Sequence, residues 1–205
     1  MKRRDVLAGA TAFVASPAFA QTQAGPAPAG PTRVAFETPQ GRIVLEIYPD
    51  KAPITSRNFL RYVDAKRYDG ATFYRASRAP TEPQIGLVQG GVQNDPKKLF
   101  PPIAHESTTL TGLRHKDGTI SLARWAQGTA TADFFICSGD AAYLDANPSA
   151  SGDNAGFAAF GQVVEGMDVV RKILAMHTSP TAGSGSMHGE MLDPPVPILT
   201  VRRAP

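Results

Sequence analysis

The sequence predicts a mainly β, antiparallel fold, either a barrel or a sandwich, and three observations point to it. About eight short segments are rich in the β-branched and aromatic residues typical of strands, and clusters of Gly, Pro, Asp and Asn separate them. Only two segments have the spacing of apolar residues that indicates a helix. Strands and helices do not alternate regularly along the chain, which argues against a doubly wound parallel sheet.

The first segments of the folded domain predict a hairpin followed by a helix. Residues 33–38 (RVAFET) and 42–49 (RIVLEIYP) have the composition of strands, and the turn sequence PQG lies between them. A helix is expected at about 53–66, because a proline is acceptable in the first turn and the apolar residues of this segment share one face.

The rest of the chain predicts more strands, one more helix and one long loop. The helix is expected within 167–175 (MDVVRKILA), and the Gly/Ser/Pro-rich segment 181–197 is expected to be a mobile loop. Further strands are expected in the segments ATFYRA (71–76), IGLVQG (85–90), GTISLAR (118–124), DFFICS (133–138), AFGQVV (159–164) and PILTVRR (197–203).

The domain organisation follows from the length and from the N-terminal composition. With 205 residues and 42% apolar content, the chain can bury the core of one domain, which we place at 32–205. Residues 1–20 have a basic start, a short apolar centre and Ala-Phe-Ala before Gln21, as in a secretory signal peptide. The apolar run is shorter than a bilayer-spanning helix requires. Residues 21–31, rich in Pro, Ala and Gly, are expected to form a flexible leader.

These features predict a periplasmic protein that is free of the membrane after signal cleavage. The pair Arg3-Arg4 resembles a twin-arginine export signal, and an ordinary Sec signal fits about equally well. Without residues 1–20, the chain has 18 basic and 17 acidic residues, so its charge gives no reason to expect nucleic-acid binding. We expect the mature protein to be a monomer.

The composition gives no sign of a metal or a cofactor. The four histidines are not paired at the spacing of metal ligands, and no glycine-rich phosphate loop is present. The single cysteine, Cys137, lies in an apolar segment, where a buried thiol without a catalytic role is expected.

A series of short motifs carries the functional information. In chain order they are FYR, QGG, GTISLAR, DFFIC, YLD and FAAFGQVVEGMDVV. This series resembles the cyclophilin family of peptidyl-prolyl cis-trans isomerases, whose members carry F-H-R, F-M-x-Q-G-G, Q-F-F-I and related motifs in the same order. The resemblance extends from about residue 33 to 203 and is greatest to the bacterial exported cyclophilins.

The resemblance implies an eight-stranded antiparallel barrel capped by two helices, and an isomerase that acts on proline-containing polypeptides without a cofactor. Arg75 matches the family's catalytic arginine, Gln89 the glutamine that orients it, and Phe135 the ring that lines the proline pocket. The resemblance places the following residues at the bound peptide: Leu87, Ala123, Arg124, Tyr143, Leu144 and Phe157. Ala123 and Arg124 would bind the peptide through their main chain.

Arginine suits this chemistry for a physical reason. Rotation about an X-Pro bond crosses a barrier of ~18–20 kcal/mol, because twisting destroys the resonance of the amide. In the twisted state the prolyl nitrogen regains a lone pair, and a permanent N–H donor aimed at it stabilises only that state.

Three departures from the family pattern concern the site. Thirteen residues separate Arg75 from Gln89, about six more than is common, and Gly86 stands where the family has a pocket phenylalanine, so an apolar wall could be missing. Ile85 or the longer loop could fill that gap. Asp133 replaces a frequent glutamine and could compete for Arg75, and Phe157 replaces a histidine of many eukaryotic members. The alternative function is therefore a peptide-binding, chaperone-like module with little or no turnover.

Overall fold

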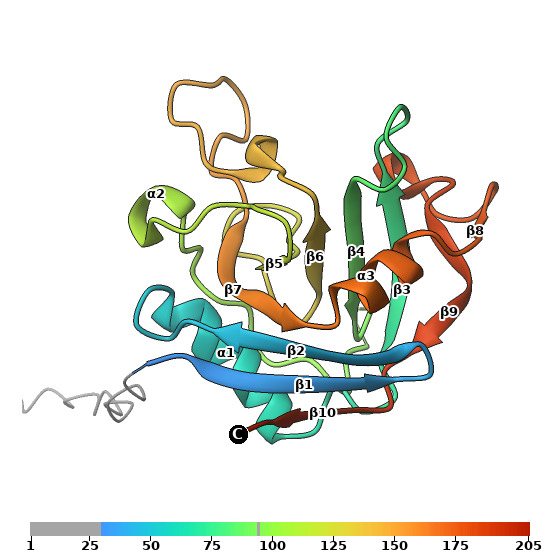
Figure 1. Cartoon of the computed structure of the whole chain (residues 1–205). Helices are drawn as coiled ribbons and strands as arrows, with labels where there is room; N and C mark the ends of the chain where they lie inside the picture. The colour runs from blue at the N-terminus through green and yellow to red at the C-terminus, as the bar shows by residue number, and fades with distance from the viewer. Residues whose placement is uncertain (1–29, 94) are drawn as a thin grey trace, which may run out of the picture.

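The computed structural model describes residues 30–93 and 95–205, which form one strongly curled antiparallel sheet with helices packed on it (Figure 1). The predicted signal peptide and most of the predicted leader lie outside the described residues. The strands are β1 Thr32–Thr38, β2 Gly41–Ile47, β3 Thr72–Arg78, β4 Gly86–Gly91, β5 Thr119–Leu122, β6 Phe134–Ser138, β7 Ala158–Glu165, β8 Thr178–Ser179, β9 Met191–Pro197 and β10 Thr200–Arg203. The helices are α1 Pro53–Asp64, α2 Thr108–Thr111 and α3 Met167–Leu174, with 3-10 turns η1 Ala142–Leu144 and η2 Gly185–Met187.

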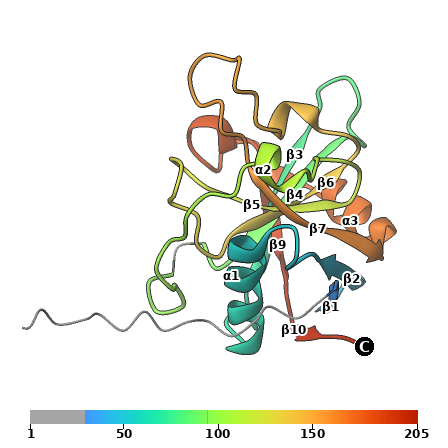
Figure 2. The same ribbon diagram turned by 90° about the vertical axis from the view of Figure 1, so that its left-hand side faces the viewer.

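The order of the strands explains how the sheet curls. It runs β10-β1-β2-β7-β5-β6-β4-β3-β9-β8, and every pair is antiparallel. Only two residues separate β9, which pairs with β3, from β10, which pairs with β1 at the opposite end of the sheet. The covalent chain therefore brings the two ends of the sheet together. Helix α1 packs against β7 and β10, and α3 packs against β2, β3, β4 and β6 (Figures 1 and 2).

The structure corrects the element count. The expected hairpin and the helices at 53–66 and 167–175 are confirmed, but the described residues contain ten strands and three α-helices, where eight strands and two helices were expected. The segment predicted to be one mobile loop contains η2 and most of its C-terminal part is β9. β9 carries three prolines and no apolar alternation, so its pairing with β3 decides its conformation and its sequence does not.

The core is built around the ring of Phe134. This ring contacts Phe36, Phe59, Tyr68 and Phe73 at centroid distances of 5.4–6.1 Å, in edge-to-face arrangements that aromatic rings favour. All five side chains are fully buried. Side chains alternate along a strand, so assigning Phe135 to the proline pocket predicts that its neighbour Phe134 points into the core, as we also expect for Phe73. Both predictions are confirmed.

Strand β4 is rich in glycine because side chains from its neighbours approach it closely. A Cβ atom on Gly90 would lie 2.9 Å from the ring of Phe73 and 3.3 Å from that of Phe134, so the two rings can meet across β4 only without it. At Gly86 a Cβ atom would lie 2.0 Å from the carbonyl oxygen of Ser77 on β3. This position is therefore filled by the adjacent strand, and a larger residue has no room there.

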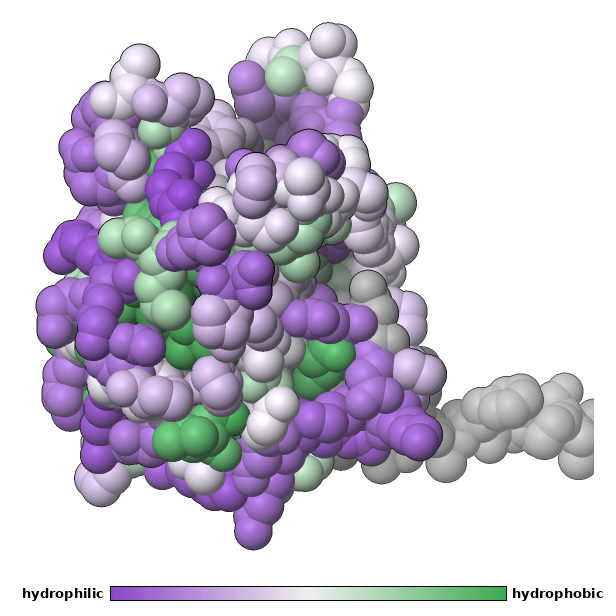
Figure 3. Space-filling view, turned by 90° about the vertical axis from the view of Figure 1, so that its right-hand side faces the viewer, coloured by the Kyte–Doolittle hydropathy of each residue, from purple (hydrophilic) through white to green (hydrophobic). Residues whose placement is uncertain are grey.

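The surface gives little sign of an extended apolar face. The large apolar side chains exposed among the described residues are scattered over several elements, and the side of the molecule shown in Figure 3 is mainly hydrophilic with small, separate apolar patches. None of the helices in the described part of the chain has the length and apolar character needed to cross a membrane.

Replacing Gly86 should test the close contact between β3 and β4. We expect Gly86→Ala to lower the free energy of unfolding by about 2 kcal/mol or more, because the new Cβ atom forces the two strands apart. Gly70→Ala is the matched control: Gly70 also has a positive φ, but its Cβ atom would meet no atom within 4 Å. We expect it to cost only about 1 kcal/mol. Equal losses in urea denaturation would contradict the steric explanation.

Candidate active site

The site begins at a β-bulge in strand β3. Phe73 pairs with Gly90 of β4, and Arg75 pairs with Gln89, so Tyr74 is an extra residue in the ladder. In a regular strand, neighbouring side chains point to opposite faces, whereas a bulge turns one of them. As a result Phe73 points into the core, while the side chains of Tyr74 and Arg75 both reach Gln89.

Arg75 is held from two sides. Its Nη1 donates a hydrogen bond to Oε1 of Gln89 at 2.8 Å, and its Nε donates to Oε2 of Glu190 at 2.7 Å. Glu190 also accepts a hydrogen bond from the hydroxyl of Ser77, so the carboxylate is itself fixed. The arginine side chain is only 17% exposed. Among the described residues, nothing accepts the second N–H of Nη1, and this donor is available to a ligand.

A chain of hydrogen bonds fixes the amide of Gln89. Its Nε2 donates to the hydroxyl oxygen of Tyr74 at 2.7 Å, and that hydroxyl donates to Oδ2 of Asp133 at 2.9 Å. Each bond runs in the same direction, from the Arg75 guanidinium to the Asp133 carboxylate, so the bonds polarise one another. Gln89 is 9% exposed, and its amide has a partner at each end.

An apolar cluster lies in the same cross-strand row as the arginine. Phe135 of β6 pairs with Gln89, which pairs with Arg75, so the main chain of Phe135 lies two strands from that of Arg75, or ~10 Å at the usual strand spacing. The cluster around this ring consists of Leu87, Ala123, Phe135, Cys137, Ala141, Leu144 and Phe157. The rings of Phe135 and Phe157 meet edge to face at 5.3 Å.

A buried histidine supports Phe135 from behind. The His115 ring stacks on Phe135 at 5.9 Å, its Nδ1 lies 2.7 Å from Oδ1 of Asp145, and its Nε2 lies 3.0 Å from the hydroxyl of Ser121. Burial lowers the pKa of His115, and the contact with Asp145 offsets this only in part. The order Ser-His-Asp is that of a hydrolase, but Ser121 is fully buried and no substrate can reach its hydroxyl. The hydrogen bonds of His115 with Ser121 and Asp145 therefore fix the ring that stacks on Phe135.

The other predicted site residues are placed as follows. Leu87 and Leu144 are buried in the apolar cluster and Phe157 is half-buried at its edge, whereas Tyr143 on η1 is 76% exposed. Partial burial raises the pKa of the Tyr143 hydroxyl.

Ala123 and Arg124 directly follow β5, which ends at Leu122. The guanidinium of Arg124 is directed away from the site, where it forms an ion pair with Asp153 at 2.6 Å and donates to the carbonyl oxygen of Gly156. The main-chain N–H and C=O of Arg124 have no partner within residues 30–93 and 95–205. They are free to bind an extended peptide.

The structure corrects two expectations about charge and shape. Asp133 does not compete for Arg75: its carboxylate accepts hydrogen bonds from Tyr74 and from the main-chain N–H of Gln93, and the acid paired with Arg75 is Glu190. Ile85 does not complete the apolar cluster either, because it lies against Gly139 beyond the end of β6.

Sequence reasoning missed Glu190, His115, Asp145 and Tyr74 as parts of the site. Glu190 lies in a segment expected to be a mobile loop, and the bulge that turns Tyr74 leaves no mark in the strand pattern. Only the YLD motif pointed to Asp145, and it gave no role. The expectation for Cys137 is confirmed: it is fully buried, and burial raises the pKa of its thiol to about 12.

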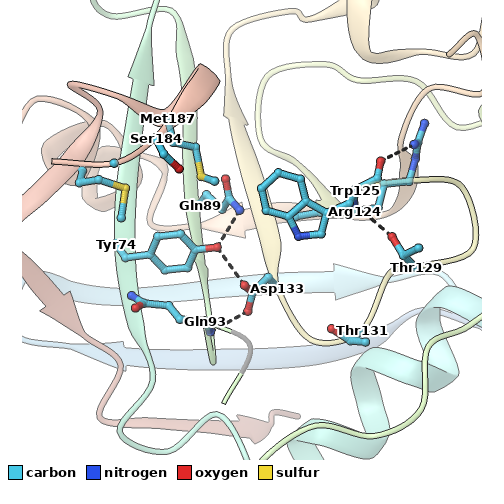
Figure 4. Close-up of a pocket in the computed structure, with 13 residues that line it drawn as sticks. Tyr74, Gln89, Gln93, Arg124, Trp125, Thr129, Thr131, Asp133, Ser184 and Met187 are labelled. Atoms are coloured by element: carbon cyan, nitrogen blue, oxygen red, sulfur yellow. Dashed lines mark hydrogen bonds between the residues drawn. The ribbon is translucent and has the colours of Figure 1, made fainter. Parts of the chain in front are cut away.

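A pocket of about 290 Å³ opens beside Gln89 (Figure 4). It is lined by residues of β3, β4 and β9, of the segment 123–133 and of the segment 183–187. Asp133 lies at the pocket, with Tyr74 and Trp125 on either side of it in the view of Figure 4. In the described part of the chain, no three His, Cys, Asp or Glu side chains are grouped so that they could hold a metal ion.

Comparison with known proteins identifies the family of the chain. The family model described as "Cyclophilin type peptidyl-prolyl cis-trans isomerase/CLD" matches residues 33–202. The chain is 37% identical over 172 residues to a peptidyl-prolyl cis-trans isomerase of Acinetobacter baylyi, a match that covers 83% of this chain and 85% of that protein. It is 35% identical over 159 residues to peptidyl-prolyl cis-trans isomerase B of Escherichia coli, covering 77% and 91%.

A solved structure shares the fold. A cyclophilin-type isomerase of Cryptosporidium parvum, crystallised in the presence of the dipeptide Ala-Pro, superposes with a TM-score of 0.64 at 17% identity, covering 84% of this chain and 99% of that one. The chain therefore belongs to the cyclophilin-type peptidyl-prolyl cis-trans isomerase family. It is an enzyme, a peptidyl-prolyl cis-trans isomerase.

The buried histidine predicts how stability depends on pH. The pKa of His115 is lower in the folded than in the unfolded protein. The stability that the neutral His115 ring contributes is therefore fully present above the unfolded pKa of about 6.5, and it is lost as the pH falls through the folded pKa. We expect the free energy of unfolding to fall between pH 7 and pH 5, and to fall less in His115→Gln. The control is His188→Gln, at an exposed position; urea denaturation curves with the same pH dependence in all three proteins would overturn this assignment.

Proposed function

We propose that the reaction takes place between Arg75 and the apolar cluster. The proline ring of a bound polypeptide rests on Phe135, with Leu87, Leu144 and Phe157 around it, and the free N–H of Arg75 Nη1 is directed at the prolyl nitrogen. The observation that carries this proposal is the cross-strand row, which holds Arg75, Gln89 and Phe135 in adjacent strands.

The physical reason for catalysis is a difference between two states of the substrate. In the planar amide the prolyl nitrogen shares its lone pair with the carbonyl group and accepts a hydrogen bond poorly. In the twisted amide the lone pair is free, and a fixed cationic donor stabilises it. Gln89 and Glu190 hold the guanidinium before the substrate arrives, so little reorganisation is needed.

Binding of the peptide main chain leaves the X-Pro bond free to turn. The unpartnered N–H and C=O of Arg124 support pairing with an extended segment on one side of the proline. The ring held on Phe135 then stays still while the other side of the bond rotates.

We further propose that the substrates are exported proteins and that the enzyme is a periplasmic monomer. The support is the composition of residues 1–20, with its basic start, apolar centre and Ala-Phe-Ala end. Uncatalysed prolyl isomerisation takes tens to hundreds of seconds and can limit the folding of such proteins.

The first test concerns Arg75. We expect Arg75→Ala to reduce kcat/KM at least about a hundredfold, as the loss of a preorganised donor does in other enzymes, with an unchanged circular dichroism spectrum. The measurement is the cis-to-trans relaxation of an X-Pro tetrapeptide at low temperature. Arg42→Ala, which removes an exposed arginine of β2, is the control. Full turnover in Arg75→Ala would refute the role of Arg75, and peptide binding without turnover in the wild type would favour the binding module.

The second test concerns export. When the whole chain is produced in a Gram-negative bacterium, we expect the protein in the periplasmic fraction to begin at Gln21 and to have the mass of a monomer by light scattering. Replacing Arg3 and Arg4 by lysine separates the two routes, since it blocks twin-arginine export and leaves Sec export intact. Uncleaved protein confined to the cytoplasm would contradict the proposal.

A further inference from the structure

The pocket beside Gln89 contains a carboxylate with no cation paired to it. Asp133 accepts hydrogen bonds from the hydroxyl of Tyr74 at 2.9 Å and from the N–H of Gln93 at 3.1 Å, and both donors are neutral. No Lys, Arg or His nitrogen of the described residues lies within 4.0 Å of its oxygens. A carboxylate in a partly enclosed site without a cationic partner is unusual, because removing its charge from water is costly.

Arg124, which lines the pocket, and Arg75, whose partner Gln89 lines it, are already paired with other acids. The guanidinium of Arg75 is bound by Glu190, and that of Arg124 by Asp153. Figure 4 shows the Arg124 side chain directed away from Asp133. The negative charge in the pocket is therefore left for a ligand.

The rest of the pocket also suits a cation with a long apolar stem. Trp125 lines it with 71% of its surface exposed, and the face of an indole ring attracts cations. Met187 and Met191 provide apolar contact for a methylene chain, and Thr129 and Thr131 provide hydroxyl oxygens. Burial raises the pKa of Asp133, and the hydrogen bonds from Tyr74 and Gln93 offset this only in part.

The pocket and the apolar cluster share a wall. Ala123 lines the pocket and also packs against the apolar cluster. An extended chain advances about 3.3 Å per residue. The proposed function places the prolyl nitrogen at Arg75, and Gln89, the partner of Arg75, lines the pocket, so the residues that precede the proline and are joined to that nitrogen lie toward the pocket.

We propose that Asp133 makes this isomerase select substrates with a lysine or arginine side chain one or two residues before the proline. The cationic group enters the pocket and pairs with the Asp133 carboxylate, while its stem lies along Trp125 and the methionines. This specificity rests on the proposed function, since it takes the proline position from it.

The test uses the single tryptophan of the chain as a reporter of binding. Trp125 lines the pocket, so its fluorescence follows peptide binding whether or not the bond isomerises. Two peptide sets, acetyl-Xaa-Ala-Pro-Phe-amide and acetyl-Ala-Xaa-Pro-Phe-amide, carry Lys, norleucine or Glu at Xaa. In one of the two sets we expect the Lys peptide to bind about fivefold more tightly than the norleucine peptide at low salt. The Glu peptide should bind more weakly than both. The Lys preference should shrink at high salt.

Two variants assign the effect to Asp133. Asp133→Asn should bind Lys and norleucine peptides equally, whereas Glu165→Gln, which removes the same charge from an exposed position on β7, should keep the fivefold ratio. Thr131→Lys leaves Asp133 in place and supplies a tethered cation at the pocket, so it should also abolish the preference. This second variant keeps the test valid if Asp133→Asn does not fold.

The outcomes separate the pocket from the enzyme mechanism. A wild type that treats Lys and norleucine alike in both sets at low salt, or an Asp133→Asn protein that keeps the preference, overturns the inference. If the enzyme speeds the cis-to-trans relaxation of all peptides but binds Lys and norleucine peptides equally, the proposed catalysis stands and the specificity fails. If the fluorescence shows the preference and its loss in Asp133→Asn while no peptide relaxes faster, the specificity stands and the proposed catalysis fails.

Discussion

The β-bulge at Tyr74 is the constraint on which the site depends. A regular strand would place Tyr74 and Arg75 on opposite faces, so that one of them would enter the aromatic core. The extra residue lets Phe73 keep its place against Phe134 while the next two side chains both reach Gln89. One irregular residue thus joins a well-packed interior to a polar site on the same strand.

In strand β6, neighbouring side chains also point to the core and to the opposite face, and no bulge is needed. Phe134 fills the centre of the core, and its neighbour Phe135 lies in the apolar cluster, where the buried His115 stacks on it. The ring that is proposed to hold the proline is therefore backed by side chains with their own fixed hydrogen bonds. A donor and a ring held in this way need little reorganisation on binding, and this is the property that a donor to the twisted amide requires.

Charge is distributed unevenly around the site. Each arginine near it is paired with an acid: Arg75 with Glu190, and Arg124 with Asp153. The pair with Glu190 orients the guanidinium that we propose for catalysis and still leaves one N–H of Nη1 without a partner among the described residues. Asp133 has no cationic partner among the described residues, and it anchors the hydrogen-bond chain that ends at Arg75. Substrate selection and catalysis would thus use opposite ends of the same chain of hydrogen bonds.

The sequence by itself determined the antiparallel class, the first hairpin and the two longer helices, because these follow from local periodicity and composition. The alternation of side chains, together with the family resemblance at Phe135, assigned Phe134 to the core. The ordered motifs also pointed to the family to which the chain belongs. Tertiary structure alone decided the pairing of β9 with β3, the partner of Arg75 and the surroundings of Asp133. These depend on contacts between residues far apart in the chain, such as Arg75 and Glu190, and no local pattern encodes which strands become neighbours.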